Sequence, residues 1–336
     1  MPEVITTYLG RESPAVRHMV GRHIPCSHAS RQGRGRTCDA HGFELGVATL
    51  PGSSHTECHD EVSRELFDII REARLPIELQ PCHYFDTLVP VAALMAQGRN
   101  PSIVPDACMP RVALPEVVTQ IRGRRGPPEA ARRLLFDVKT IHGGTGHYYT
   151  PWAEQEQSGA VHARELGIWA DYQRHARELD SRHSPAGTQP ILQRLRSFGR
   201  TRGLVFGAYG EASADVHDLI TLSATTQAEQ MWRESGARTA TEMRAVLISR
   251  MRRRMGMAAV QAMARHRLAR VPYVGVTREV VQARARRMAR GQQQHQRGAA
   301  WCMRPRASTS TLRGSRAVWE RRGRRRRCEG RRMVRV

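Results

Sequence analysis

The clearest pattern of apolar and polar positions lies at residues 134–141, where Leu-Leu-Phe-Asp-Val-Lys-Thr-Ile runs on without the break that a helical period imposes. Apolar and β-branched residues of this kind predict a buried β-strand. Asp137 and Lys139 interrupt the run two positions apart, so the strand's period of two places both side chains on one face. Because charge on a core strand is costly unless it is paired or binds something, this strand is the first candidate for a functional site.

The rest of the chain predicts an α+β fold, with a small mixed sheet flanked by helices. Apolar residues at helical spacing indicate helices, and short apolar runs bounded by Gly or Pro indicate strands. The predicted strands are residues 77–85, 102–106, 134–141 and 203–209. The predicted helices are residues 60–74, 160–180, 215–232, 241–270 and a short basic helix that reaches Arg290. The apolar run at residues 89–96 does not distinguish a helix from a strand.

Changes in composition divide the chain into four predicted segments. Residues 1–57 are rich in Gly, Ser, His and Arg and show little periodicity, which predicts a loop-rich, poorly ordered segment. Residues 58–212 form the predicted core, and residues 213–290 form a helical extension. Residues 291–336 are an Arg-rich tail of low complexity that is predicted to be disordered.

Positive charge is abundant and unevenly distributed. The net charge is +23, and from residue 278 to the end 19 arginines stand against three acidic residues. Lys139 is the single lysine among the 54 Lys and Arg residues, so only this position carries a compact ammonium whose pKa a protein can tune. The charge indicates a polyanionic partner, of which nucleic acid is the natural one, with DNA favoured. The alternative is a compositionally biased tail with no selected role.

Cysteine usage and hydropathy bear on the cellular compartment. Seven cysteines at irregular spacing do not form the pattern of a disulfide framework, which favours a reducing environment. No run of about 18 apolar residues predicts a membrane span, and the N-terminal residues lack the apolar segment of a signal peptide. An intracellular protein is therefore expected, with no membrane partner and with the nucleus as one candidate compartment.

Cysteines and histidines gather in the first sixty residues. A zinc ion takes Cys and His as its usual ligands, and Cys26, Cys38, His41 and Cys58 are the four candidates. One residue separates Cys26 from His28, two separate Cys38 from His41, and sixteen separate His41 from Cys58, which is not the spacing of a standard zinc finger. The same residues can equally be unrelated surface side chains.

Two acids and the lysine offer a second kind of metal chemistry. If the short strand that ends at Asp106 pairs with the strand at residues 134–141, the carboxylates of Asp106 and Asp137 converge on one hard cation. Lys139 then lies where an attacking water would be held. The alternative is that Asp106 is a turn residue and that Asp137 and Lys139 form a solvent-facing pair worth less than about 1 kcal/mol.

This pattern resembles the PD-(D/E)xK nuclease superfamily. The resemblance rests on Pro105-Asp106, on Asp137-Val138-Lys139 and on an acidic helix beginning near His59, and it covers about residues 59–212. It implies a restriction-endonuclease-like core with the element order αβββαβ. The 31 positions from Asp106 to Asp137 imply an insertion that contains the basic loop at residues 122–128.

The resemblance also implies roles for single residues. Asp106 and Asp137 would bind Mg²⁺, and Lys139 would orient or help to deprotonate the attacking water and stabilise charge on the scissile phosphate. Glu61, or else Glu65, would be the helix acid that assists the metal. The stretch from Cys38 to His59 is similar to the Cys/His segment that precedes the nuclease-like end of some retroelement proteins, which implies a degenerate metal knuckle beside the nuclease fold.

Three functions remain open on this reading. The leading hypothesis is a Mg²⁺-dependent nuclease or nuclease-like protein that acts on DNA. The alternative is a non-catalytic nucleic-acid-binding protein that uses the basic helices from Asp215 onward and the tail. The third is an open reading frame with little function, whose arginine-rich C-terminal end reflects coding bias.

Overall fold

The central sheet has four strands in the order β3-β4-β5-β6. A computed structural model describes residues 2–8, 11–25, 36–52, 54–81, 83–95, 102–110, 133–143, 154–277 and 279–288. The strands are β3 (Glu78–Leu79), β4 (Ala107–Pro110), β5 (Arg133–Thr140) and β6 (Arg202–Phe206). The first three pair antiparallel, and β5 pairs parallel with β6, so the predicted mixed sheet is confirmed. Five consecutive residues of β5 are buried, as expected of a strand covered on both faces.

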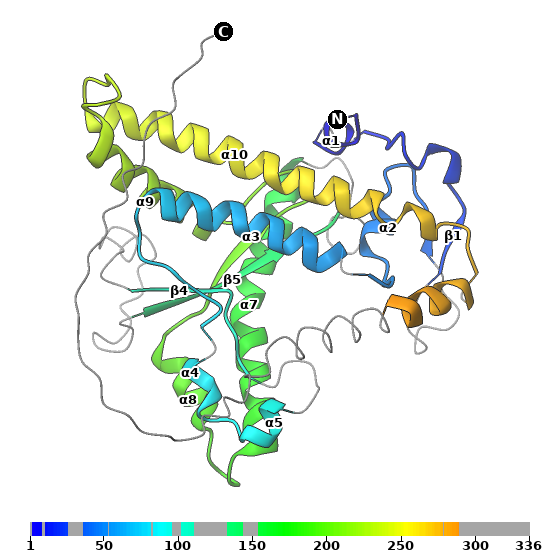
Figure 1. Cartoon of the computed structure of the whole chain (residues 1–336), viewed down its shortest axis with the longest axis horizontal. Helices are drawn as coiled ribbons and strands as arrows, with labels where there is room; N and C mark the ends of the chain where they lie inside the picture. Colours follow the sequence, from blue (N-terminus) through cyan, green and yellow to red (C-terminus); the bar gives the residue numbers. More distant parts are fainter. Residues whose placement is uncertain are drawn as a thin grey trace, which may run out of the picture. The chain divides into compact units, whose positions relative to one another are not determined.

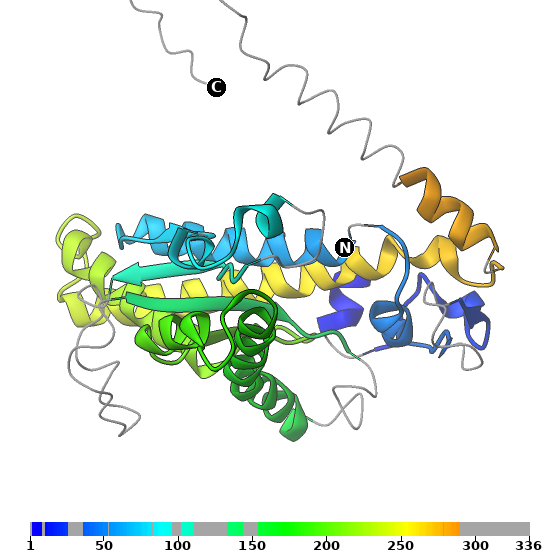
Figure 2. The same cartoon turned by 90° about the horizontal axis from the view of Figure 1, so that it is seen from below.

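Helices cover the two faces of this sheet. One layer contains α3 (Ser54–Glu72), α9 (Ala214–Met231) and α10 (Ala240–Leu268), and the other contains α7 (Glu154–His183) and α8 (Pro190–Ser197). Figure 1 shows α3 and α10 running side by side over the strands, and Figure 2 shows α7 on the opposite side. The element order α3, β3, β4, β5, α7, β6 follows the predicted αβββαβ order, with the short helices α4 (His83–Asp86), α5 (Val91–Met95) and α8 added.

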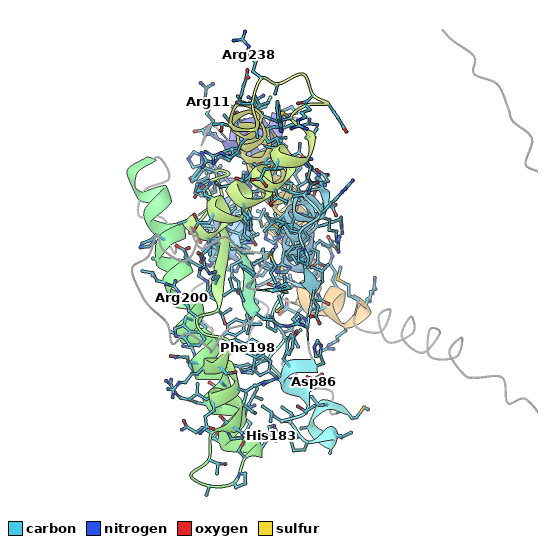
Figure 3. All side chains as sticks on the ribbon, turned by 90° about the vertical axis from the view of Figure 1, so that its left-hand side faces the viewer. Arg11, Asp86, His183, Phe198, Arg200 and Arg238 are labelled. Atoms are coloured by element: carbon cyan, nitrogen blue, oxygen red, sulfur yellow. The ribbon has the colours of Figure 1, made fainter. Side chains whose placement is uncertain are left out.

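Each layer has its own hydrophobic core. The larger core joins apolar side chains of α3, β5, β6, α9 and α10, including Leu66, Phe136 and Met255. The helices after residue 213, expected to form an extension, are thus part of the main core, and residues Met1–Ala289 form one compact unit. On the other side, Phe198 packs 5.1 Å from Tyr84 between ring centroids. Figure 3 shows Phe198 between α7 and the segment of α4 that carries Asp86.

A glycine brings β6 against α7. A side chain at Gly203 would place its Cβ 2.6 Å from Cδ1 of Ile168 and 3.2 Å from Cα of Glu165, so a larger residue would require α7 to shift. Glycine within a strand often marks such a close approach. On α7, Val161, Ile168, Ala176 and Leu179 are buried, in agreement with the helix expected at residues 160–180.

The described N-terminal residues form several short elements within the segment that was predicted to be loop-rich, residues 1–57. They form α1 (Pro2–Tyr8), a 3-10 helix at Arg17–Met19, the antiparallel pair β1 (His23–Ile24) and β2 (Arg36–Thr37), and α2 (Phe43–Val47). Their apolar residues, among them Ile24 and Leu45, pack with Tyr273 and Val281 from the other end of the compact unit. These packing partners lie more than 200 positions away in the sequence, so the local pattern of apolar residues does not predict the contacts.

Several predicted boundaries were wrong. The strand expected at residues 102–106 begins only at Ala107 and runs through Pro110, which can end a strand because the last position needs no ladder N–H. Of the strand expected at residues 77–85, only β3 forms, and α4 follows it; the undecided run at 89–96 contains helix α5. Residues 279–288 are helical, as expected. The loop at 122–128, the glycine-rich loop beyond Gly143 and the tail at 291–336 lie outside the described residues.

None of the helices in the described ranges combines the length and the apolarity needed to cross a membrane.

Candidate active site

The pairing of β4 with β5 brings Asp106 to the acidic and basic residues of β5. Ala107 is opposite Phe136, so the preceding residue, Asp106, lies at the level of Asp137 and Val138. The backbone N–H of Val138 donates a 2.7 Å hydrogen bond to Oδ2 of Asp106. This carboxylate therefore takes the place of a backbone carbonyl just before the start of β4, and the bond fixes its position against β5.

Asp137 and Lys139 lie on one face of β5, as the period of two predicts. The Lys139 ammonium is 3.0 Å from Oδ1 of Asp137 and 2.8 Å from Oδ2, and it donates a hydrogen bond to Oδ1. The Asp137 side chain is 5% exposed and the Lys139 side chain is 37% exposed. The pair thus extends from the interior, where its acid lies, to the surface, where its amine lies.

The carboxylate of Asp137 is held in an unfavourable environment for negative charge. Burial raises its pKa above the usual range, the Lys139 ammonium opposes that rise, and the nearby Asp106 carboxylate adds to it. Oδ2 of Asp137 is buried, and the Lys139 ammonium lies 2.8 Å from it. A carboxylate in this state gains from any further positive charge that approaches it.

His59 of α3 completes the group from the helix side. Its Nε2 is 3.3 Å from Oδ2 of Asp106, and its Nδ1 is 3.1 Å from Oδ1 of Asp60. The hydrogen bond to Asp106 is the main cause that raises the pKa of His59 to about 9, against the lowering effect of burial. His59 is therefore a cation at neutral pH in this arrangement, and it lies beside a carboxylate that was expected to bind metal.

The helix residue that reaches the site is thus a histidine and not one of the two expected acids. Glu61 pairs with Arg265 of α10, and Glu65 pairs with Arg254 of the same helix. The helical period accounts for this difference, because the half-buried His59 lies one turn before the buried Val62, whereas the glutamates pair with arginines of α10. The helical spacing of these residues was visible in the sequence and could have pointed to His59.

Tyr172 is a second site residue that the sequence did not point to. Its hydroxyl donates a 2.8 Å hydrogen bond to Oδ1 of Asp137, from α7 on the other side of the sheet. Burial, followed by the charge of Asp137, raises the pKa of Tyr172 well above its usual value, so the phenol remains a donor. Tyr172 lies in the helix predicted at residues 160–180, but no sequence signal shows what its hydroxyl contacts.

The structure does not gather the expected zinc ligands. Cys26 lies outside the described residues, while Cys38 belongs to the N-terminal core and Cys58 to the main core. Burial raises the pKa of Cys38 to about 11 and that of Cys58 to about 12, so both remain thiols. Among the described residues, Cys38, His41 and Cys58 form no metal-sized group.

The arrangement as a whole brings two acids and two bases together near one end of β4 and β5. Asp106 and Asp137 carry oxygen atoms of the kind that hard cations prefer, and Lys139 and His59 carry positive charge of the kind that pairs with anions. No protein-family model, curated protein or solved structure matches the chain.

Proposed function

We propose that the protein is a nuclease that hydrolyses DNA phosphodiester bonds with the help of Mg²⁺. The observation that carries the proposal is the convergence of Asp106, Asp137 and Lys139 where β4 meets β5. It agrees with the resemblance of these residues to the PD-(D/E)xK superfamily and with the αβββαβ order of the elements around them.

The residues fit a divalent cation. Two carboxylates lie close enough for the charge of Asp106 to raise the pKa of Asp137, whose buried Oδ2 has the partly exposed Lys139 ammonium 2.8 Å away. Asp106 and Asp137 would hold the ion, which supplies a Lewis acid and an activated water when it is bound. Glu61 and Glu65 are engaged with arginines of α10, so we do not include them among the ligands.

The remaining polar residues have roles that follow from their positions. Lys139 is the more exposed member of its pair, so its ammonium can face a non-bridging oxygen of the scissile phosphate or the water beside it. His59 would hold Asp106 in place and add a second positive charge near the phosphate. Tyr172 positions Asp137 through its hydrogen bond to Oδ1.

Positive charge elsewhere supports a nucleic-acid substrate. The whole chain carries a net charge of +23, and Arg250, Arg252 and Arg253 are exposed on α10. Contacts of arginines with phosphates release counterions, so binding is expected to weaken steeply as salt is added. Arg254, which follows them in the sequence, instead pairs with Glu65 and Glu72 of α3 and joins two helices.

The test is metal-dependent cleavage of plasmid DNA by the full chain. Asp137→Asn and Lys139→Ala are each expected to lower the cleavage rate at least about 100-fold, the scale of losing one preorganised electrostatic contact in a transition state. The matched control is Asp68→Asn, an exposed acid of α3 that pairs with Arg71 and should cleave at the wild-type rate. Equal cleavage by all four proteins would remove these residues from the mechanism.

Stability separates a functional role for Asp137 from a structural one. Because burial disfavours its charge, Asp137→Asn should leave the melting temperature unchanged or raise it while cleavage is lost. A lower melting temperature together with lost cleavage would indicate that the ion pair with Lys139 mainly supports the fold.

A second function is favoured by the exposed arginines of α10. A non-catalytic nucleic-acid-binding protein would use Arg250, Arg252 and Arg253 and would not need the acids of the sheet. Changing these three arginines to glutamine would then lower the affinity for DNA and flatten its dependence on salt. Asp137→Asn would leave both quantities unchanged, and no cleavage would be seen with any protein.

A further inference from the structure

Three histidines from distant parts of the chain meet at one end of the compact unit. His55 lies in the first turn of α3, His142 two residues after β5, and His266 in the last turn of α10. The ring centroid of His266 is 4.3 Å from the ring centroid of His55 and 4.3 Å from that of His142, and the centroids of His55 and His142 are 5.1 Å apart. Within the described ranges these three form the single group of His, Cys, Asp or Glu whose ligand atoms all lie within 4.8 Å.

The hydrogen bonds of His266 determine which of its nitrogens is free to act as a ligand. Its Nε2 lies 3.0 Å from the carbonyl oxygen of Gly46, an acceptor, so Nε2 carries the proton. The proton-free Nδ1 is buried and makes no hydrogen bond within the described part of the chain. His266 itself is 2% exposed, so the ring is enclosed by the protein. Backbone carbonyls that fix the tautomer in this way are the usual second contact of metal-binding histidines.

The other two histidines differ in their surroundings. His142 is 9% exposed, and the residue after it packs so tightly that a Cβ on Gly143 would lie 2.5 Å from the ring of Phe43. His55 is exposed, which leaves one side of the group open to solvent. Burial, followed by the charge of Arg270, lowers the pKa of His266 to about 4, so this imidazole is neutral in the folded protein.

We propose that His55, His142 and His266 form a binding site for a transition-metal ion of the zinc class. Imidazole nitrogen suits zinc, copper and nickel, whereas Mg²⁺ and Ca²⁺ prefer oxygen, so this site and the acidic site select different ions. Zn–N bonds of about 2.0–2.1 Å place two tetrahedral ligand nitrogens roughly 3.4 Å apart. Nitrogens that already lie within 4.8 Å need only small side-chain rotations to reach that spacing.

Three protein ligands leave the fourth position of a tetrahedral ion open, and the exposed side at His55 is where that position faces. The ion would join the start of α3, the end of β5 and the end of α10. These are the elements between which the N-terminal residues are held, since Arg270, four residues after His266, also donates to the carbonyl of Gly46. Bound zinc would thus stabilise the folded chain by mass action.

The test uses the full chain after removal of metal with a chelator. Competition with a chromophoric chelator measures zinc affinity and stoichiometry, and Co²⁺ in place of zinc reports the ligands through its visible absorption. One zinc ion per chain is expected, with a higher melting temperature and a cobalt spectrum without the thiolate charge-transfer band. His55→Gln, at the exposed ligand, should fold normally and bind zinc more than about 10-fold more weakly. His83→Gln, an exposed histidine of α4, is the matched control and should bind like the wild type.

His266→Asn is expected to abolish zinc binding. If this substitution at a buried position prevents folding, the result for the exposed His55→Gln still tests the proposal. Asp137→Asn should bind zinc normally, which separates this site from the proposed nuclease centre. Failure of the wild type to bind zinc would overturn the proposal. So would equal affinities of the wild type and His55→Gln, or a thiolate band in the cobalt spectrum, because the ion would then be held by cysteines.

Discussion

Arg270 offers the sharpest test of how the two ends of the compact unit are joined. It is 1% exposed, and its Nη1 lies 3.0 Å from the carbonyl oxygens of Leu45 and Gly46 and 2.6 Å from that of Ala48, while its Nε is 3.2 Å from Oγ of Ser54. These carbonyls lie at the end of α2, where no helical N–H can bind them. We therefore expect Arg270→Met, which keeps much of the volume and removes the donors, to loosen the joint between α2 and α10.

The magnitude follows from two opposing contributions. Hydrogen bonds from a charged group stabilise by roughly 1.5–3 kcal/mol each, so three of them contribute about 5–9 kcal/mol. Burial lowers the pKa of Arg270 from 12.5 to about 10, which corresponds to a cost of about 3 kcal/mol for keeping the cation inside. The difference predicts a net loss of about 2–6 kcal/mol, and we expect the lower half of that range because one Nη1 shares its protons among three carbonyls.

The assay is urea denaturation of the full chain followed by circular dichroism. The control is Arg265→Met on the same helix, where an exposed ion pair with Glu61 is worth less than about 1 kcal/mol. If Arg270→Met is within about 0.5 kcal/mol of the wild type, the carbonyl bonds only compensate for the burial of the cation, and Arg270 does not hold the joint.

Two further predictions concern a helix start and the histidine of the candidate active site. Asp180 accepts hydrogen bonds from the backbone N–H groups of Ile191 and Leu192 at the start of α8, so Asp180→Ala should lower the free energy of unfolding by about 2–4 kcal/mol. The control is Glu178→Ala, at an exposed acid, which should lower it by less than about 1 kcal/mol. Similar losses for the two variants in urea denaturation would refute the capping role of Asp180. His59 has a pKa raised from 6.5 to about 9, so its contribution to stability is complete below pH 6.5 and disappears as pH rises through 9. With a chelator present to remove metal, the difference in unfolding free energy between wild type and His59→Gln should shrink as the pH rises from 6.5 to 9. A difference that is constant with pH would contradict the pairing of His59 with Asp106.

The sequence predicted the part of the site that lies on one strand. The period of two in β5 put Asp137 and Lys139 on the same face, and the apolar run around them correctly indicated a strand in the middle of the sheet. Asp106 was expected beside them, and the structure places it there, although β4 follows Asp106 instead of ending at it. Local pattern was sufficient because neighbouring residues of one strand determine one another's direction.

Residues brought in by tertiary contacts were not predictable in the same way. Tyr172 looks like any other member of the apolar stripe of α7, and its hydroxyl becomes a site group only because α7 crosses β5 at Asp137. The same holds for His266 and Arg270, which bind a carbonyl 220 and 224 positions earlier in the chain. Periodicity reports which face of an element is buried, but not what that face meets.

The meeting of the first and last elements of the compact unit has a consequence for protein synthesis. Ile24 and Leu45 pack with Tyr273 and Val281, so the N-terminal residues leave the ribosome long before their partners exist. At about 5–20 residues per second, the roughly 230 intervening residues require about 10–50 seconds of translation. During that interval the apolar side chains of the nascent segment are exposed to chaperones and to other chains. The rate of elongation therefore limits how early this end of the molecule can fold.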